Sequence, residues 1–181
     1  PSSAASDVYK RQAYSLLSAA VLAATAGTLN AQLRVVNWNI TNYSGDRAID
    51  IRSSVYGVFN GLSMSPDVII LEEIIEGGGS LSAQQSAGQA VMNSFVSILN
   101  ATPGGPGDWA AAPYVANEGD TGNGLAYRTS KTTYIGVLTL NQNTGSGSDQ
   151  APRDTQRWRL RIAGTTSPAA ELYLYGSHMQ A

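Results

Sequence analysis

Two hydrophobic runs in the first half of the chain have the pattern of β-strands. The run 33–40, LRVVNWNI, is rich in β-branched residues and ends in polar loop residues. The run 68–71, VIIL, is apolar at every position, as in a strand that is buried on both faces. The turn Ser65-Pro66-Asp67 precedes it, and we predict a strand in each run.

Between these strands the apolar positions change to helical spacing, which predicts a helix over 46–62. Ser44 or Asp46 would supply its N-cap. The apolar positions that define this helix are Ile51, Val55, Val58 and Leu62.

A second helix is predicted after the glycines at 77–79. Ser82 and Gln85 have the spacing of a capping box at its start, and Pro103 lies beyond its end. Its apolar side consists of Val91, Phe95, Ile98 and Leu99.

The second half of the chain consists of strand-like segments separated by turn residues. The loop 141–152 is polar and rich in Gly and Ser. The predicted strands are 112–117, 123–130, 133–140, 156–164 and 170–178. A β-α-β-α order followed by a strand meander predicts an α+β fold, with helices packed on a mixed sheet.

The N-terminal segment has the features of a secretion signal rather than of a folded element. Lys10 and Arg11 precede a short apolar run, 13–31, that ends in small residues. This is the order of regions in a signal peptide, and cleavage after Ala31 would make the protein secreted or periplasmic. A buried helix is the disfavoured alternative, and the run is too short for a stable membrane anchor. Residues 1–12 look like foreign sequence left by DNA assembly.

Composition excludes some chemistry. Hydrophobic residues make up 43% of the 181 residues and charged residues 13%, as in a globular domain. The formal net charge of −2 gives no basic excess of the kind that indicates nucleic-acid binding. The chain has no cysteine, which excludes disulfides, zinc–thiolate sites and thiol nucleophiles. Metal sites built from oxygen ligands stay open.

Polar side chains gather where the apolar strands end, which is where open α/β sheets bind ligands. Amide and carboxylate oxygens at such a place suit Mg²⁺, which takes one or two carboxylates and fills its other positions with water and phosphate oxygens. A histidine beside it could donate to a phosphoryl oxygen. The residues in question are Asn37, Asn39, Glu72, Glu73, Ser177 and the only histidine, His178.

Each of these residues also has an ordinary structural interpretation. Asn39 could bond to the turn that follows it, and His178 could be a structural histidine. Glu72 and Glu73 could be solvated, and because they are adjacent only one of them can point to a given face of the sheet.

The motifs taken together are more specific. VVNWNI, PDVIILEEI, GLAYRTS, an arginine-containing strand and LYLYGSH occur in an order that resembles the endonuclease/exonuclease/phosphatase superfamily, which has the deoxyribonuclease I-like fold. The resemblance covers residues 33–181.

The resemblance implies a role for several residues. Asn39 and Glu73 match the metal-site asparagine and glutamate, with Mg²⁺ as the expected cofactor and Mn²⁺ or Ca²⁺ as alternatives. His178 matches the first of two histidines and would donate a hydrogen bond to the scissile phosphate. Tyr127 matches loosely a strand beside the active site. Arg153 fits the region of the phosphate-side arginine, with Arg157 as a rival.

The resemblance also implies that part of the domain is missing. The expected fold is a four-layer α/β sandwich, with helices outside two packed mixed β-sheets, whose C-terminal half is absent from the chain. The later motifs Gly-Asp-x-Asn and Ser-Asp-His do not occur, so we expect the chain to be inactive as given. We also expect the inner face of the first sheet to lie exposed, which would favour aggregation or a molten state.

The function that these observations favour is a secreted, Mg²⁺-dependent phosphoesterase, of the nuclease type, whose substrate is a phosphodiester such as nucleic acid. A phospholipid or a sugar phosphate is an alternative substrate. A secreted binding or adhesion domain that retains the fold without catalysis is the alternative from another class. A carbohydrate-binding β-sandwich is disfavoured because it would not contain the two helices.

Overall fold

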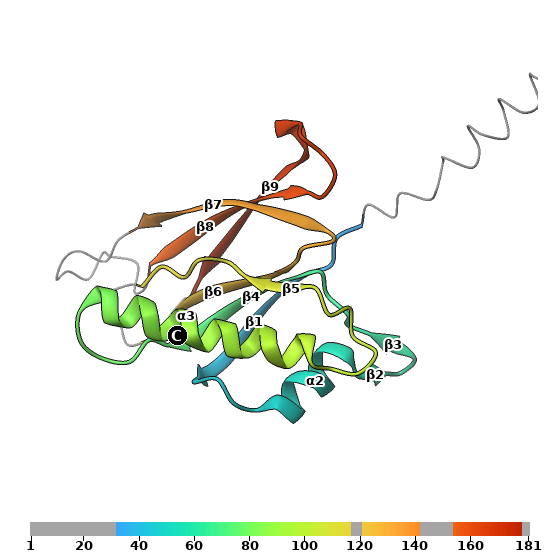
Figure 1. Cartoon of the computed structure of the whole chain (residues 1–181), viewed down its shortest axis with the longest axis horizontal. Helices are drawn as coiled ribbons and strands as arrows, with labels where there is room; N and C mark the ends of the chain where they lie inside the picture. The colour runs from blue at the N-terminus through green and yellow to red at the C-terminus, as the bar shows by residue number, and fades with distance from the viewer. Residues whose placement is uncertain (1–31, 117–120, 142–153, 179–181) are drawn as a thin grey trace, which may run out of the picture. The chain divides into compact units, whose positions relative to one another are not determined.

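The fold is known from a computed structural model that describes residues 32–116, 121–141 and 154–178, and the described residues from Leu33 onward belong to one compact unit (Figure 1). Three predicted segments lie outside these ranges: the foreign sequence at 1–12, the predicted signal peptide 13–31, and all but the first residue of the loop 141–152. Among the described residues, no helix is long and apolar enough to cross a membrane.

The strands form two larger sheets and one small hairpin. The first sheet has the order β1-β4-β6-β5, in which β1 runs parallel to β4 and the other pairs are antiparallel. The second sheet is antiparallel with the order β7-β8-β9. The strands of the two sheets are β1 (Val35–Tyr43), β4 (Val68–Ile75), β5 (Trp109–Ala111), β6 (Thr121–Arg128), β7 (Thr132–Asn141), β8 (Thr155–Ile162) and β9 (Glu171–Ser177).

Two helices cover one face of the first sheet. Helix α2 spans Ala48–Tyr56 and α3 spans Leu81–Asn100, and a 3₁₀ turn at Pro168–Ala170 precedes β9. Figure 1 shows α3 running along the first sheet on the side opposite β7–β9. The core between helices and sheet contains, among others, Ile69, Leu71 and Ile74 of β4 and Phe95 and Leu99 of α3.

The inner face of the first sheet is covered, which corrects the expectation that it would be exposed. Val68, Ile70 and Leu125 are buried on this face, and Trp158 and Leu160 of β8 pack against them. The second sheet of this chain is therefore large enough to bury the apolar row of β4. The helix–sheet–sheet arrangement confirms the predicted α+β class.

The first helix is shorter than its apolar spacing predicts. It ends at Tyr56, and the chain then forms the hairpin β2 (Val58–Phe59) and β3 (Leu62–Ser63), in which Val58 and Leu62 are exposed. The turn between the two strands is Asn60-Gly61, and both residues have positive φ. Asn-Gly is the pair that a two-residue hairpin turn requires, and this turn signal overrides the helical spacing.

The predicted helix caps are also wrong. The N-cap of α2 is Arg47, whose side chain makes no capping hydrogen bond. The N-cap of α3 is Ser80 rather than Ser82, and its hydroxyl accepts from the N–H of Ala83. The segment 112–117 is not a strand in its described part, because the strand there, β5, ends at Ala111. The other predicted strands are confirmed, with ends that differ by up to four residues.

Candidate functional site

The site lies where β1 and β4 both depart from regular pairing. Asn39 pairs with Glu72 and Tyr43 with Ile74, so β1 uses three residues (40–42) where β4 uses one. On its other side β4 has a bulge, because Leu71 pairs with Gly124 and Ile74 with Gly122. The two irregularities meet at Glu73.

The bulge decides which way Glu73 points. Its φ is 63°, a left-handed conformation that costs a residue with a side chain about 1 kcal/mol or more. In a regular strand Glu73 would follow Ile69 and Leu71 into the core. The extra residue instead places Ile74 there, fully buried, and leaves the side chain of Glu73 19% exposed.

Three of the predicted site residues converge at this point, from three strands and both sheets. The amide nitrogen Nδ2 of Asn39 donates to Oε1 of Glu73 at 2.8 Å. Nε2 of His178 lies 3.2 Å from the same carboxylate oxygen and 3.4 Å from Nδ2 of Asn39. Residues 139 positions apart in the sequence are thus brought into one cluster, which we call the site cluster (Asn39, Glu73 and His178).

Backbone amides complete the contacts of the site cluster. The N–H of Thr41 donates to Oδ1 of Asn39 at 2.9 Å, and the N–H of Asn42 donates to Oε2 of Glu73 at 3.1 Å. Both Thr41 and Asn42 have positive φ. The left-handed turn near the end of β1 therefore directs two N–H groups at the side chains of Asn39 and Glu73.

The contacts of His178 indicate which nitrogen carries its proton. Asn39 Nδ2 is a donor only, and Glu73 Oε1 is an acceptor, so the arrangement with a proton on Nε2 satisfies the shorter contact. Nδ1 is buried and has no hydrogen-bond partner among the described residues. The imidazole thus presents an N–H to an anionic oxygen at the exposed end of the cluster.

Gly176 allows β9 to bring His178 this close to the first sheet. A Cβ at position 176 would lie 2.7 Å from the ring of Trp158, which is closer than real Cβ contacts, and 3.0 Å from a methyl group of Ile70. Only glycine fits between the two sheets at this level.

The adjacent glutamate has a different environment. Glu72 is 9% exposed, and its Oε1 accepts from Nδ2 of Asn37 at 2.8 Å. The pair Asn37–Glu72 therefore repeats the amide–carboxylate contact of Asn39–Glu73, but its carboxylate is buried and its asparagine is exposed. Of the two glutamates that the sequence offers, Glu73 is the one in contact with His178.

The structure does not bring the predicted Tyr127 to the site cluster. Tyr127 pairs with Val68, at the start of β4, five residues before Glu73, and a strand rises about 3.3 Å per residue. Its ring stacks on that of Tyr134 at a centroid distance of 6.2 Å. The reason is that β6 runs antiparallel to β4, so the end of β6 lies beside the beginning of β4.

The structure does not place either of the two predicted arginines at the site cluster. Arg153 lies outside the described residues. Its rival Arg157 stacks over the ring of Tyr173, with 5.2 Å between the guanidinium carbon and the ring centroid. Gln156 and Trp158, its neighbours on β8, are buried, so Arg157 points away from the first sheet.

Sequence reasoning missed a buried amide pair next to the site cluster. Asn123 lies opposite the bulge of β4, and its Nδ2 contacts the carbonyl oxygens of Asp154 and Gly176 at 3.2 and 3.3 Å and Oε1 of Gln156 at 3.0 Å. These contacts join β6 to the beginning of β8 and the end of β9. Asn123 is the first residue of the predicted strand 123–130, just before the motif GLAYRTS, but nothing in the sequence indicated that its amide would be buried.

A shallow depression adjoins Asn39 on the side of helix α2. Its volume is about 220 Å³. Its lining residues are Trp38, Asn39, Ile40, Thr41, Arg47, Asp50 and Ile51. Among the described residues, no group of three His, Cys, Asp or Glu side chains is placed to hold a metal ion.

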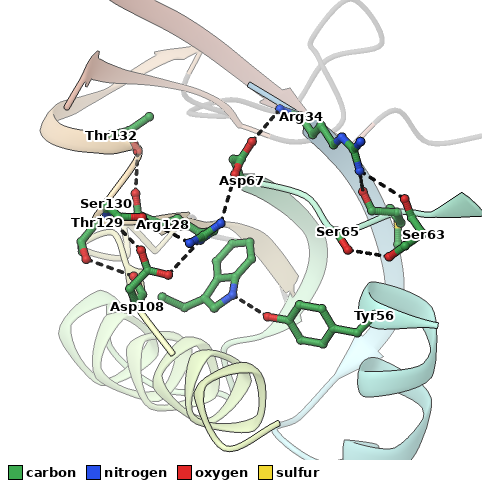
Figure 2. Close-up of polar contacts among 12 residues, drawn as sticks. Arg34, Tyr56, Ser63, Ser65, Asp67, Asp108, Arg128, Thr129, Ser130 and Thr132 are labelled. Atoms are coloured by element: carbon green, nitrogen blue, oxygen red, sulfur yellow. Dashed lines mark hydrogen bonds and ion pairs between the residues drawn. The ribbon is translucent and has the colours of Figure 1, made fainter. Parts of the chain in front are cut away.

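The opposite end of the first sheet carries a second polar cluster, shown in Figure 2. Arg128 of β6 donates from Nε to Oδ1 of Asp108 at 2.8 Å and lies 3.4 Å from Oδ1 of Asp67 through its NH1 nitrogen. Burial raises the pKa of the Asp108 carboxyl, but hydrogen bonds from Arg128 and Ser130 outweigh it and lower that pKa below its usual value. We call Asp67, Asp108 and Arg128 the anchor cluster.

Comparison with known proteins finds similarity in structure only. No protein-family model matches the chain, and no curated protein sequence matches it. Two similar solved structures are of D. rerio TDP2: a form humanized by 14 mutations (20% identity, TM-score 0.46) and a complex with a single-strand DNA product (18% identity, TM-score 0.42). They cover 84% and 81% of this chain, whereas the chain covers 52% and 46% of theirs.

The chain thus spans about half the length of the structures that it matches. At this level of identity the similarity concerns the fold.

Proposed function

We propose that the chain carries the metal-binding part of the active site of a phosphodiester hydrolase. The observation that supports this most is the convergence of Asn39, Glu73 and His178 at the ends of three strands. A carboxylate, an amide and an imidazole N–H are the groups that hold a hard cation and an anionic phosphoryl oxygen side by side.

The donor set fits a hard divalent cation with few protein ligands. Glu73 offers a carboxylate that is 19% exposed, and Asn39 offers an amide oxygen next to it. Mg²⁺ is usually held by one or two carboxylates and keeps several waters, so a site with one carboxylate suits it. Glu73 would be the principal ligand with Asn39 beside it, and the cation would polarise a phosphoryl oxygen.

The residues of the chain have separate tasks in this proposal. Asn39 orients Glu73 through its Nδ2 and is itself held by the N–H of Thr41. His178 has its Nε2 directed at Glu73. When a phosphate oxygen lies at the exposed end of the cluster, the same N–H can donate to it and stabilise the negative charge that develops there.

The substrate in this proposal is a phosphodiester, with single-stranded nucleic acid as the first choice. The complex of D. rerio TDP2 with a single-strand DNA product suggests that probe. We further propose that the natural protein is secreted and that a longer reading frame supplies Gly-Asp-x-Asn and Ser-Asp-His segments, which would activate the attacking water. Without them we expect the 181-residue chain to bind metal but not to turn over substrate.

The test compares the 181-residue chain with the product of the complete reading frame. The complete product should hydrolyse a single-stranded oligonucleotide or bis(p-nitrophenyl) phosphate only with a divalent cation present. N39A, E73Q and H178A should each lower kcat by about 100-fold or more, whereas Y127F, in a tyrosine that lies away from the site cluster, serves as the matched control. Hydrolysis that persists in E73Q would contradict the role of Glu73 as the metal ligand. A complete product that binds a ligand but has no hydrolase activity would favour a binding domain instead.

A further inference from the structure

Arg47 is an arginine outside the site cluster whose side chain reaches the turn next to it. Its NH1 nitrogen donates to the carbonyl oxygen of Ile40 at 2.7 Å. Its NH2 nitrogen donates to the carbonyl of Thr41 at 2.7 Å and lies 3.3 Å from that of Asn42. One guanidinium thus holds three consecutive carbonyl groups, and they are those of the three residues by which β1 loops out beside Glu73.

The other side of the same peptide units faces the site cluster. The N–H of Thr41 donates to Asn39 and the N–H of Asn42 to Glu73. A cation at the carbonyl side of a peptide unit polarises it and strengthens the N–H as a donor. Arg47 therefore acts on both site residues through the peptide groups between them.

The turn needs such support because its backbone is strained. Thr41 and Asn42 have φ values of 53° and 50°, and a left-handed conformation at a residue other than glycine persists only where surrounding contacts enforce it. Arg47 also has positive φ and begins helix α2, where its carbonyl accepts from the N–H of Ile51. The guanidinium is therefore fixed to a helix that packs on the core.

A purely structural role explains this arrangement less well. The side chain of Arg47 is 38% exposed and its contact with Asp46, at 3.8 Å, is long. Arg47 is not a member of the hydrophobic core, and of the three residues whose carbonyls it holds only Ile40 belongs to that core. Its strong contacts all go to the turn that presents the two N–H groups.

We infer that Arg47 is a positioning residue for the metal-binding pair Asn39–Glu73, acting through the left-handed turn at 40–42. The inference rests on the proposed function, because it assumes that Glu73 takes a cation. Arginine is required rather than lysine, because only the planar guanidinium group has N–H donors placed to bind two neighbouring carbonyl oxygens at once.

The experiment measures the affinity of the 181-residue chain for Mn²⁺ alone, by electron paramagnetic resonance of free Mn²⁺. R47Q should weaken binding by about 10-fold, the lower end of the range for residues that orient metal ligands, and R47K by less. Hydrogen exchange at the amides of Thr41 and Asn42 should become faster in R47Q, while the amides of β4 keep their protection.

The matched control is Arg34, which precedes the other end of β1. Its NH1 nitrogen also contacts two backbone carbonyls, those of Ser63 and Met64, each at 3.3 Å. R34Q should leave the Mn²⁺ affinity unchanged.

Three outcomes would contradict the inference. Parent affinity in a folded R47Q overturns it, and so does an equal loss in R34Q, which would indicate a general effect on stability. If R47Q does not fold, R47K is measured in its place. An R47K variant with the Mn²⁺ affinity of the parent would show that the guanidinium group is not needed, and would overturn the inference. Failure of the proposed function looks different, because the parent chain would then bind no Mn²⁺, or E73Q would bind it as well as the parent does.

Discussion

The two ends of strand β4 hold acidic groups in opposite ways. At the beginning of the strand, Asp67 and Asp108 share the guanidinium of Arg128, and β4 is regularly paired from Val68 to Leu71. At the far end, Glu73 sits in a bulge with positive φ. Its described partners there are the amide of Asn39, the N–H of Asn42 and the imidazole of His178.

The difference shows what each end is suited for. The anchor cluster balances its negative charge within the protein through an arginine, so its contribution is to stability. In the site cluster, by contrast, no arginine or lysine among the described residues pairs with the partly exposed carboxylate of Glu73, which leaves it able to attract a cation from solution. Three residues around the site cluster, Thr41, Asn42 and Glu73, have left-handed backbones, and such strain is common at functional sites. Near the anchor cluster only Ser65, two residues before Asp67, has positive φ among the described residues other than glycine.

The sharpest test of this comparison separates the two adjacent glutamates. E73Q should weaken Mn²⁺ binding by more than about 100-fold, because it removes the charged ligand itself rather than a residue that orients one. E72Q is the matched control, since Glu72 is buried against Asn37 and a glutamine oxygen can still accept that hydrogen bond. Isothermal titration calorimetry gives both affinities. A comparable loss of Mn²⁺ affinity in E72Q would contradict the assignment of Glu73 as the metal ligand.

The anchor cluster should respond in stability and not in metal binding. R128Q leaves Asp67 and Asp108 without their shared cation, and we expect the free energy of unfolding to fall by about 2 kcal/mol. Urea denaturation measures this change. The Mn²⁺ affinity of the folded variant should equal that of the parent, and a large loss of affinity would mean that the two ends of β4 are coupled.

Acid should weaken the anchor cluster through Asp108. Its pKa is lowered in the folded state relative to the ordinary value of 3.8, so the unfolded chain takes up the proton first as the pH falls. The stabilisation is fully present above that ordinary value and is lost as the pH falls through the lower, folded pKa. The difference in unfolding free energy between the parent and D108N should therefore be constant above about pH 5 and narrow below about pH 4. A difference that does not change with pH would contradict the assignment.

The smallest effect is expected for Tyr127. The sequence places it among the catalytic candidates, but the structure places it near the beginning of β4. Y127F retains the ring that stacks on Tyr134, so metal affinity and unfolding free energy should change by less than about 0.5 kcal/mol. A clear loss of Mn²⁺ affinity in Y127F would require a different arrangement of β6.

The sequence was informative where an element is long and its pattern regular. The strand at 68–71, the helix containing Phe95 and Leu99, and the last three strands are where the periodicity predicts them. Prediction failed where a local turn competes with the pattern. Val58 and Leu62 continue the helical spacing of Ile51 and Val55, yet Asn60-Gly61 folds them into a hairpin.

The acidic run of β4 shows why the site itself is harder to predict. In VIILEEIIE the pattern does not distinguish the three glutamates. Glu72 is buried against Asn37, Glu73 is partly exposed and belongs to the site cluster, and Glu76 is fully buried and accepts from the hydroxyl of Tyr114 at 2.7 Å. Which one points where depends on a bulge opposite Asn123, and a bulge is set by tertiary pairing.

The same limit applies to Arg47 and Asn123. Both side chains donate hydrogen bonds to backbone carbonyl oxygens of distant or irregular segments. Such contacts produce no repeating pattern of residue types from which they could be predicted. Asn39 and His178 were predictable because Asn39 follows the apolar start of β1 and His178 directly follows β9, and strand ends meet at one edge of a sheet.

The most direct test of the central claim uses the only histidine of the chain. Its imidazole gives a single set of resonances in the NMR spectrum, so the effect of a paramagnetic ion on His178 can be read without assignment of other residues. Substoichiometric Mn²⁺ should broaden these resonances selectively in the parent chain, and the broadening should disappear in E73Q while E72Q behaves like the parent. Resonances of His178 that stay sharp when Mn²⁺ is added, or that broaden equally in E73Q, would contradict a metal site at Glu73.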